Sequence, residues 1–107
     1  MAARPRRFWL DGYILDTLMG DLVGHDRTPA AFVVYLFLWK ESRLSRRRRV
    51  SVSHRVVADE TGLSKSAVQA AVRLLKRRQL LRSYQATQTA TPEYEVLRPW
   101  VRPPRVG

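Results

Sequence analysis

A turn built on Gly62, between two helical patterns, constrains the fold of this chain more than any other feature. Ser53 is a capping residue before His54 to Glu60, and glycine at position 62 suits the left-handed conformation that ends a helix. Ser64 is a second capping residue, before a helix expected from Lys65 to about Gln79. Residues 53–79 therefore predict a helix, a tight turn and a longer helix. Ala58 is small where the second helix must cross closely, and Leu63 with Val68 is expected to fill the angle between the two helices.

Two further helices are expected before this pair. The first, within residues 8–24, is amphipathic. Thr28 as N-cap and Pro29 in the first turn begin the second helix, over residues 28–43. This helix is apolar almost all round, so Val33 and Phe37 must be covered by the first helix or by a second subunit. The expected buried face of the first helix has five members: Ile14, Leu15, Leu18, Met19 and Leu22.

Short apolar stretches predict three strands. Val50 to Val52 alternates like a strand, and two more strands lie within residues 80–97, separated by the polar loop 87–92. Tyr84 and Tyr94 are expected to face each other across this hairpin. The fold class is therefore α+β, mainly α with a small β-hairpin, in one domain over residues 1–98. The tail, residues 99–107, holds three prolines and is expected to be extended.

The positive charge is concentrated in the middle of the chain. The 107 residues carry a formal net charge of +11. Residues 1–42 are balanced, whereas residues 43–82 contain twelve Lys or Arg and two acidic residues. Such a local excess creates a field suited to a polyanion, so we expect the partner to bind this middle segment.

Several classes of protein are not expected. The chain has no cysteine, which leaves no disulfide and no thiolate metal site. No apolar run is long enough to span a membrane, and residues 1–11 lack the apolar stretch of a signal peptide, so we expect a cytoplasmic, nucleoid-associated protein. No nucleophile with a nearby base, glycine-rich phosphate loop or metal motif is recognisable, so neither an enzyme nor a cofactor, metal or small-molecule ligand is predicted.

Residues 53–79 resemble the helix-turn-helix of bacterial transcriptional regulators. The pattern that carries the resemblance is Val57-Ala58, Thr61-Gly62-Leu63-Ser64 and Val68. A helix and a strand before it, and a hairpin over residues 80–97 after it, resemble the winged helix-turn-helix variant. Phe8-Trp9-Leu10-Asp11 with Tyr35 to Leu38 also looks like the N-terminal domain of some plasmid and phage replication initiators. The resemblance implies double-stranded DNA as the partner.

In such proteins the second helix enters the major groove with its N-terminal residues facing base edges. At 100° per residue, the arc of residues 64–79 opposite the apolar stripe carries no acidic side chain. Its side chains donate hydrogen bonds to base or phosphate acceptors. The resemblance implies base contacts from five residues: Ser64, Lys65, Ser66, Gln69 and Arg73.

Phosphate contacts are expected from the flanks of this helix and from neighbouring elements: Arg46, Arg47, Arg48, Arg49, Ser53, Lys76, Arg77 and Arg82. For the loop 46–49, contact with the DNA backbone and a flexible loop that only adds to the field both stay open. The hairpin loop holds Thr and Gln where many winged-helix proteins have Arg or Lys. Arg82, at the base of the hairpin, is therefore the expected contact there.

Two other functions compete with duplex binding. The domain could be a protein-interaction module with a generic basic surface, and Val33 and Phe37 favour some protein contact, most simply a homodimer through the N-terminal helices. Single-stranded nucleic acid or RNA binding requires an exposed aromatic platform. The aromatic residues at helical spacing are instead expected to pack in the core or a dimer interface: Trp9, Phe32, Tyr35, Phe37 and Trp39.

Overall fold

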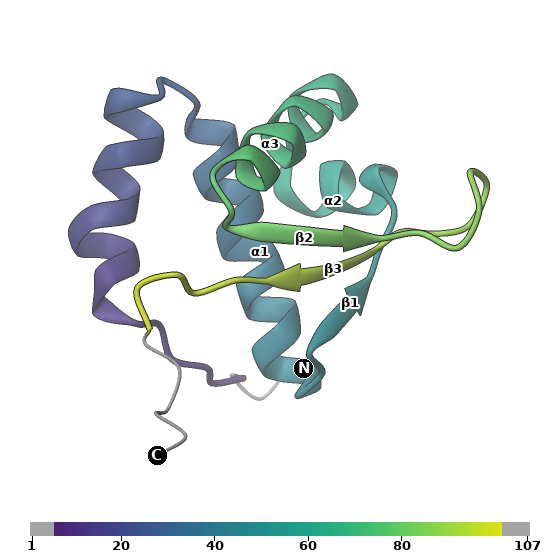
Figure 1. The fold of residues 1–107 in the computed structure, drawn as a ribbon, viewed down its shortest axis with the longest axis horizontal. Coiled ribbons are helices and arrows are strands. Elements are labelled where there is room, and N and C mark those ends of the chain that lie inside the picture. The colour runs from purple at the N-terminus through teal and green to yellow at the C-terminus, as the bar shows by residue number, and fades with distance from the viewer. Residues whose placement is uncertain (1–5, 102–107) are drawn as a thin grey trace, which may run out of the picture.

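The fold combines helices with one small antiparallel sheet. A computed structural model describes residues 6–101. After an N-terminal helical segment come α1 (Pro29–Ser45), β1 (Arg49–Ser51), α2 (His54–Thr61), α3 (Lys65–Arg77), β2 (Leu81–Tyr84) and β3 (Glu93–Val96). The N-terminal segment lies antiparallel beside α1, while α2 and α3 cover the other side of α1 (Figure 1). No helix of the described residues combines the length and apolarity needed to cross a membrane.

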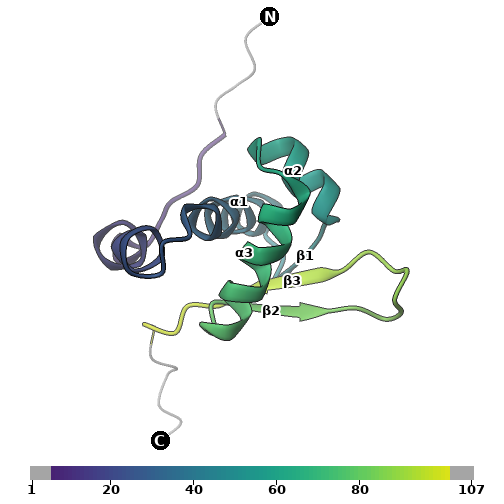
Figure 2. The ribbon, with the colours of Figure 1, turned by 90° about the horizontal axis from the view of Figure 1, so that it is seen from above.

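The sheet has the strand order β1-β3-β2, and both pairs are antiparallel. Tyr94 lies opposite Val50 on one side and opposite Ser83 on the other. The loop between β2 and β3 projects away from the helices (Figure 2). Tyr84 pairs with Glu93, so the expected pairing of Tyr84 with Tyr94 is wrong. Because successive side chains of a strand point to opposite faces, the two tyrosines lie on different faces of the sheet.

The caps of α2 and α3 form as predicted. The Ser53 hydroxyl accepts a hydrogen bond from the Val56 N–H at 3.2 Å, and the Ser64 hydroxyl accepts one from the Ala67 N–H at 3.1 Å. Gly62 ends α2 with φ 80°, a conformation that costs other residues more because of their Cβ atom. Thr28 differs from expectation, because its hydroxyl donates to the Asp26 carbonyl and makes no cap contact.

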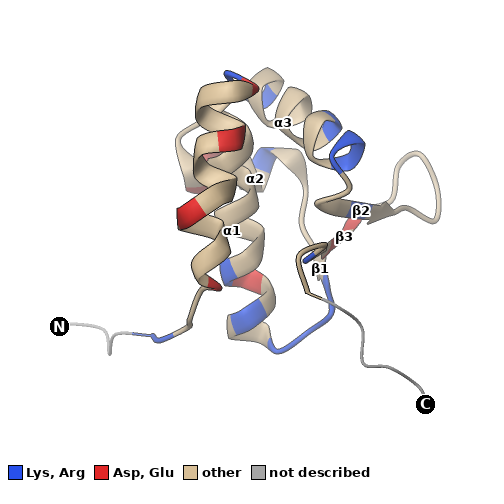
Figure 3. Ribbon diagram, turned by 60° about the vertical axis from the view of Figure 1, so that its left-hand side comes forward, with Lys and Arg blue, Asp and Glu red and all other residues tan. Residues whose placement is uncertain are grey.

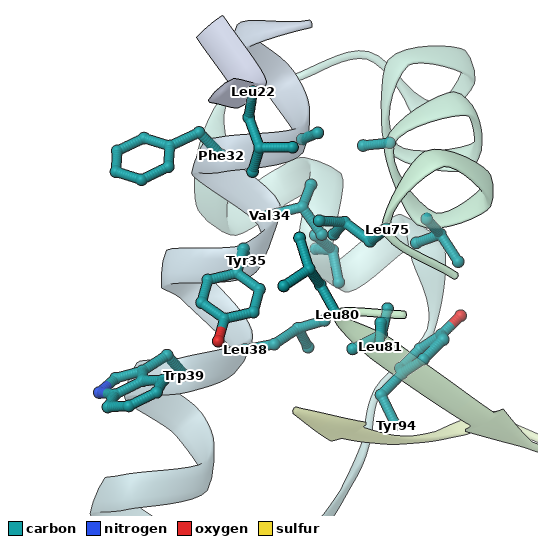
Figure 4. Packing of buried hydrophobic residues seen from close by; sticks show 14 of the residues in the cluster. Leu22, Phe32, Val34, Tyr35, Leu38, Trp39, Leu75, Leu80, Leu81 and Tyr94 are labelled. Carbon is teal, nitrogen blue, oxygen red and sulfur yellow. The ribbon is translucent and has the colours of Figure 1, made fainter. Parts of the chain in front are cut away.

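The core lies where α1 meets α3 and the sheet. Side chains from all three point toward one another (Figure 4). Two polar groups of the aromatic residues in this core are satisfied, because the Tyr35 hydroxyl donates to the Leu97 carbonyl and the Trp39 indole N–H donates to the Trp9 carbonyl, both at 2.9 Å. Members with an exposed fraction of 1% or less include Val34, Tyr35, Leu38, Trp39, Val57, Val68, Ala71 and Leu75.

The N-terminal helix begins later than residue 8 and buries a narrower face than expected. Residues 6–11 are not helical, and the helix runs from residue 12 to 25 with two π-helical segments, η1 (Ile14–Leu18) and η2 (Gly20–His25). One turn of an α-helix takes fewer than four residues, and one π-helical turn takes more than four. In this helix, which combines both kinds of turn, side chains four residues apart therefore stay close to one line along the helix. Ile14, Leu18 and Leu22 are buried, whereas Leu15 and Met19, also expected inside, are exposed.

Tertiary contacts explain the late start of this helix and the position of the tail. Asp11 Oδ2 accepts hydrogen bonds from Arg98 Nε at 2.8 Å and from Trp100 Nε1 at 2.9 Å. The Trp100 ring also stacks on Tyr13, with ring centroids 4.7 Å apart. Pro99 to Val101 are therefore held against the N-terminal segment and are not the free tail that was expected, while residues 102–107 lie outside the described residues.

The expected aromatic packing is correct for most members of the set. Phe32, Tyr35 and Trp39 are buried, and Phe37 is half-buried with Lys40 Nζ 4.6 Å from its ring centroid. Trp9 is the exception, with 64% of its surface exposed. Its backbone carbonyl holds Trp39 while its own indole lies outside the core. Val33 is also exposed, so neither the N-terminal helix nor any other described element covers it.

Candidate nucleic-acid interface

A groove runs between α3, the start of α2 and the hairpin loop. Four of the thirteen predicted contact residues line it from α3: Lys65, Gln69, Arg73 and Lys76. They share one helix face because α3 buries the opposite stripe, which includes Val68 and Leu75, against α1. Ser53 lines the same groove from the N-terminus of α2. The fold therefore brings these five predicted residues into one concave surface.

The two serines predicted at the start of α3 lie outside the groove lining. Ser64 is exposed, and its hydroxyl is used to cap the helix. The Ser66 hydroxyl lies 3.2 Å from that of Ser64. Both remain at the exposed first turn of α3, where backbone N–H groups point outward and favour a negatively charged group. Arg77 is exposed at the other end of α3 and is likewise outside the groove.

Sequence reasoning missed several residues that line the groove. His54 and Arg55 come from the first turn of α2, and Gln85, Gln88 and Thr89 come from the hairpin loop. The residues of α2 could have been found from their position just after the Ser53 cap. The loop residues could not, because only the bend of the hairpin brings them opposite α3.

Among the described residues, the groove lining contains one contact between two rings, that of His54 with Tyr94. The Tyr94 hydroxyl and His54 Nε2 are 2.8 Å apart. Burial, together with the positive charge of Lys65, lowers the pKa of His54 below its ordinary value of 6.5. Burial raises the pKa of Tyr94. At neutral pH the imidazole is therefore uncharged and can accept the tyrosine proton in a hydrogen bond.

The groove lining within residues 6–101 carries positive charge and no carboxylate. Arg55, Lys65, Arg73 and Lys76 supply four cations, and serine, glutamine and threonine side chains supply neutral donors. The acidic residues lie outside the groove lining, and Figure 3 shows several of them along the N-terminal helix. The charges are therefore segregated in space, and an anionic ligand is attracted to the groove rather than to the N-terminal helix.

Three of the arginines predicted to contact phosphate lie at the outer face of the sheet, around Glu95. Arg48 Nε donates to Glu95 Oε2 at 2.8 Å, and Arg82 lies 3.7 Å from Oε1 of the same carboxylate. The Arg49 guanidinium lies 3.6 Å from the Tyr84 ring centroid. Arg82 shares a neighbouring concavity with Lys76, so it is close to the groove but does not line it.

The loop 46–49 lies away from α3, at the far end of α1 (Figure 3). It folds back on the helix, because the Ser42 hydroxyl donates to the Arg47 carbonyl at 2.9 Å and the Arg47 N–H donates to the Ser42 carbonyl at 3.3 Å. Arg46 adopts a left-handed conformation with φ 56°. The loop is thus held in a turn by these hydrogen bonds, and Arg46 and Arg47 do not line the α3 groove.

No group of three His, Cys, Asp or Glu side chains suitable for a metal occurs among the residues that the structure describes. No protein-family model matches the chain, and neither the curated proteins nor the solved structures contain a significant match.

Proposed function

We propose that this protein is a winged helix-turn-helix domain that binds double-stranded DNA, as a small transcriptional regulator or as the DNA-binding part of a replication initiator. In this proposal α2 and α3 form the helix-turn-helix and α3 lies in the major groove. The hairpin of β2 and β3 is the wing. A cytoplasmic, nucleoid-associated location belongs to the same proposal.

The observation that carries the proposal is the groove itself. Lys65, Gln69, Arg73 and Lys76 present donors along one face of α3, and the described lining contains no carboxylate. Base edges in the major groove offer acceptors to these side chains, and phosphates attract the cations. We assign Lys65, Gln69 and Arg73 to base contacts, and Lys76, with Ser53 at the start of α2, to phosphate.

The loop of the wing lines the groove with neutral side chains and not with Arg or Lys. Gln85, Gln88 and Thr89 face the groove, and the Gln85 amide also donates to the Gln88 and Ala90 carbonyls at 3.1 and 2.8 Å. These bonds hold the loop in one shape. We therefore propose that the wing borders the DNA through neutral side chains, and that the positive charge of the interface comes from α3 and α2.

The test compares two variants that lose the same charge. Lys65→Ala, Gln69→Ala and Arg73→Ala together remove two cations from the groove, and Arg46→Asn with Arg47→Ala removes two from the far end of α1. Binding to random duplex DNA, to single-stranded DNA and to an acidic polypeptide is measured by fluorescence anisotropy at low and physiological salt. We expect a duplex preference that persists at physiological salt. The α3 variant should weaken binding to random duplex DNA at least about tenfold, since it loses two cations and a hydrogen bond to a charged group is worth about 1.5–3 kcal/mol.

The control variant should change duplex affinity far less, because its charges lie outside the groove. On random duplex DNA, where binding is mainly electrostatic, each cation that neutralises a phosphate contributes about −0.9 to the slope of log K against log salt, so loss of Lys65 and Arg73 should reduce the magnitude of the slope by up to about 1.8. Equal binding of all three polyanions, with release at the same salt, would instead support a protein-interaction module with a generic basic surface.

A further inference from the structure

A second concave surface lies at the far end of α1 and shares no lining residue with the α3 groove. It encloses about 550 Å³, within the range of small-molecule sites. The last turns of α1, the loop after it, the end of β3 and Trp9 form its walls. We call it the arginine pocket, after five of its members: Arg43, Arg46, Arg47, Arg48 and Arg98.

Two of these arginines already have a carboxylate partner. Arg48 is paired with Glu95, and Arg98 lies 2.7 Å from Asp11. Arg43, Arg46 and Arg47 have no carboxylate within 4 Å among residues 6–101, and Arg43 Nε is buried without a hydrogen-bond acceptor there. The pocket therefore has an excess of cations that suits an anion.

Contacts within the protein hold Arg43 and the backbone of the loop in place. The Arg43 guanidinium lies 4.3 Å from the ring centroid of Trp39 and 5.5 Å from that of Trp9. The hydrogen bonds between Ser42 and Arg47 hold the loop, as described above. These contacts lower the entropy cost of ordering Arg43 and the loop backbone when a ligand binds.

Trp9 gives the pocket a second kind of contact. Its indole lines the pocket with 64% of the residue exposed, while its backbone is held by the hydrogen bond from Trp39. An exposed tryptophan beside arginines can stack with a planar ring, and such stacking is worth about 1–3 kcal/mol. Phosphate recognition by arginine and ring stacking on tryptophan thus occur at the same site.

We propose that the arginine pocket binds a nucleoside phosphate, with the phosphate on Arg43, Arg46 and Arg47 and the base against Trp9. This site is distinct from the α3 groove and does not depend on duplex binding. A small-molecule ligand is not expected from the sequence, because Trp9, Arg43 and Arg98 are far apart along the chain.

The proposal is tested by isothermal titration calorimetry of the full chain with adenosine 5′-monophosphate, adenosine and inorganic phosphate. We expect saturable binding of the monophosphate that is tighter than binding of either fragment. Arg46→Asn with Arg47→Ala should weaken it at least tenfold, since charge-assisted hydrogen bonds are worth about 1.5–3 kcal/mol each. Asparagine tolerates the left-handed conformation of position 46. The α3 variant described above, with the same loss of charge, should leave it unchanged.

Trp9→Ala separates stacking from phosphate binding. It should weaken the monophosphate by about 5-fold to 100-fold and leave inorganic phosphate unaffected. Thermal unfolding of each variant checks that the fold is retained. Absence of saturable binding would overturn the proposal, as would equal weakening by the arginine-pocket and α3 variants. Tighter binding of a 5′-phosphorylated oligothymidine than of the monophosphate would identify a strand end, not a free nucleotide, as the ligand.

Discussion

Glu95 is a residue of the sheet that also pairs with the arginines at the outer face of the sheet. It is 8% exposed, on the outer face of the sheet, and accepts hydrogen bonds from Arg48 and from the Tyr84 hydroxyl. The bond from Arg48 lowers the pKa of Glu95 below its ordinary value of 4.5, against burial, which raises it, and Tyr84 and Arg82 lower it further. Glu95 lines the arginine pocket, and its carboxylate thus neutralises part of the arginine excess there.

This lowered pKa predicts a loss of stability in acid. The folded pKa lies below the unfolded one, so Glu95 stabilises the native state above pH 4.5, and the stabilisation is lost as the pH falls through the folded pKa. Urea unfolding from pH 7 to about pH 3 should show Glu95→Gln less stable than the natural protein at neutral pH, with the difference disappearing in acid. Glu93→Gln, on the same strand, is the matched control. A difference that stays constant over this range would contradict the prediction.

At the scale of the element, α3 depends on the cap at its N-terminus. Ser64 accepts the Ala67 N–H and so satisfies one of the donors that a helix leaves free at its start. Ser64→Ala should lower the free energy of unfolding by about 1 kcal/mol, whereas Ser64→Asn should retain most of it.

Chemical denaturation measures this effect, and Ser66→Ala provides the control because the Ser66 hydroxyl caps nothing. Duplex binding by the Asn variant, which keeps a cap but loses the hydroxyl, would show whether the Ser64 hydroxyl also contributes to the interface. An alanine variant at position 64 as stable as the natural protein would mean that packing of the stripe around Val68 and Leu75 alone determines the start of α3.

At the scale of the whole molecule, the N-terminal helix presents an apolar strip. Leu15, Met19 and Val23 are each 38–48% exposed, and their spacing of four residues places them on one line. We propose that this strip, with Val33 and the half-buried Phe37 on α1, forms a homodimer contact.

Sedimentation equilibrium tests the dimer. The natural protein should self-associate at micromolar concentration, and Leu15→Ser, Met19→Ser and Val23→Ser together should weaken association at least tenfold, because the side chains removed are apolar and exposed in the monomer. Replacing the neighbouring polar residues Asp16 and Thr17 by alanine is the control. A natural protein that remains monomeric would contradict the proposed contact.

The sequence by itself determined the local features of this protein. Ser53, Gly62 and Ser64 could be assigned because capping and a left-handed turn depend on a residue and its immediate neighbours. The apolar stripe of α3 follows from helical periodicity, so its opposite face with Gln69 and Arg73 was also predictable.

Only the tertiary structure decided which distant residues meet. Burial of Ile14 rather than Leu15 depends on the π-helical turns of the N-terminal segment, and the position of Trp100 depends on Asp11. The hairpin loop lies opposite α3, and Trp9 lies beside Arg43, because β-strand pairing and helix packing bring them together. Such contacts arise from packing between segments far apart in the chain, and the periodicity of a single segment does not predict them.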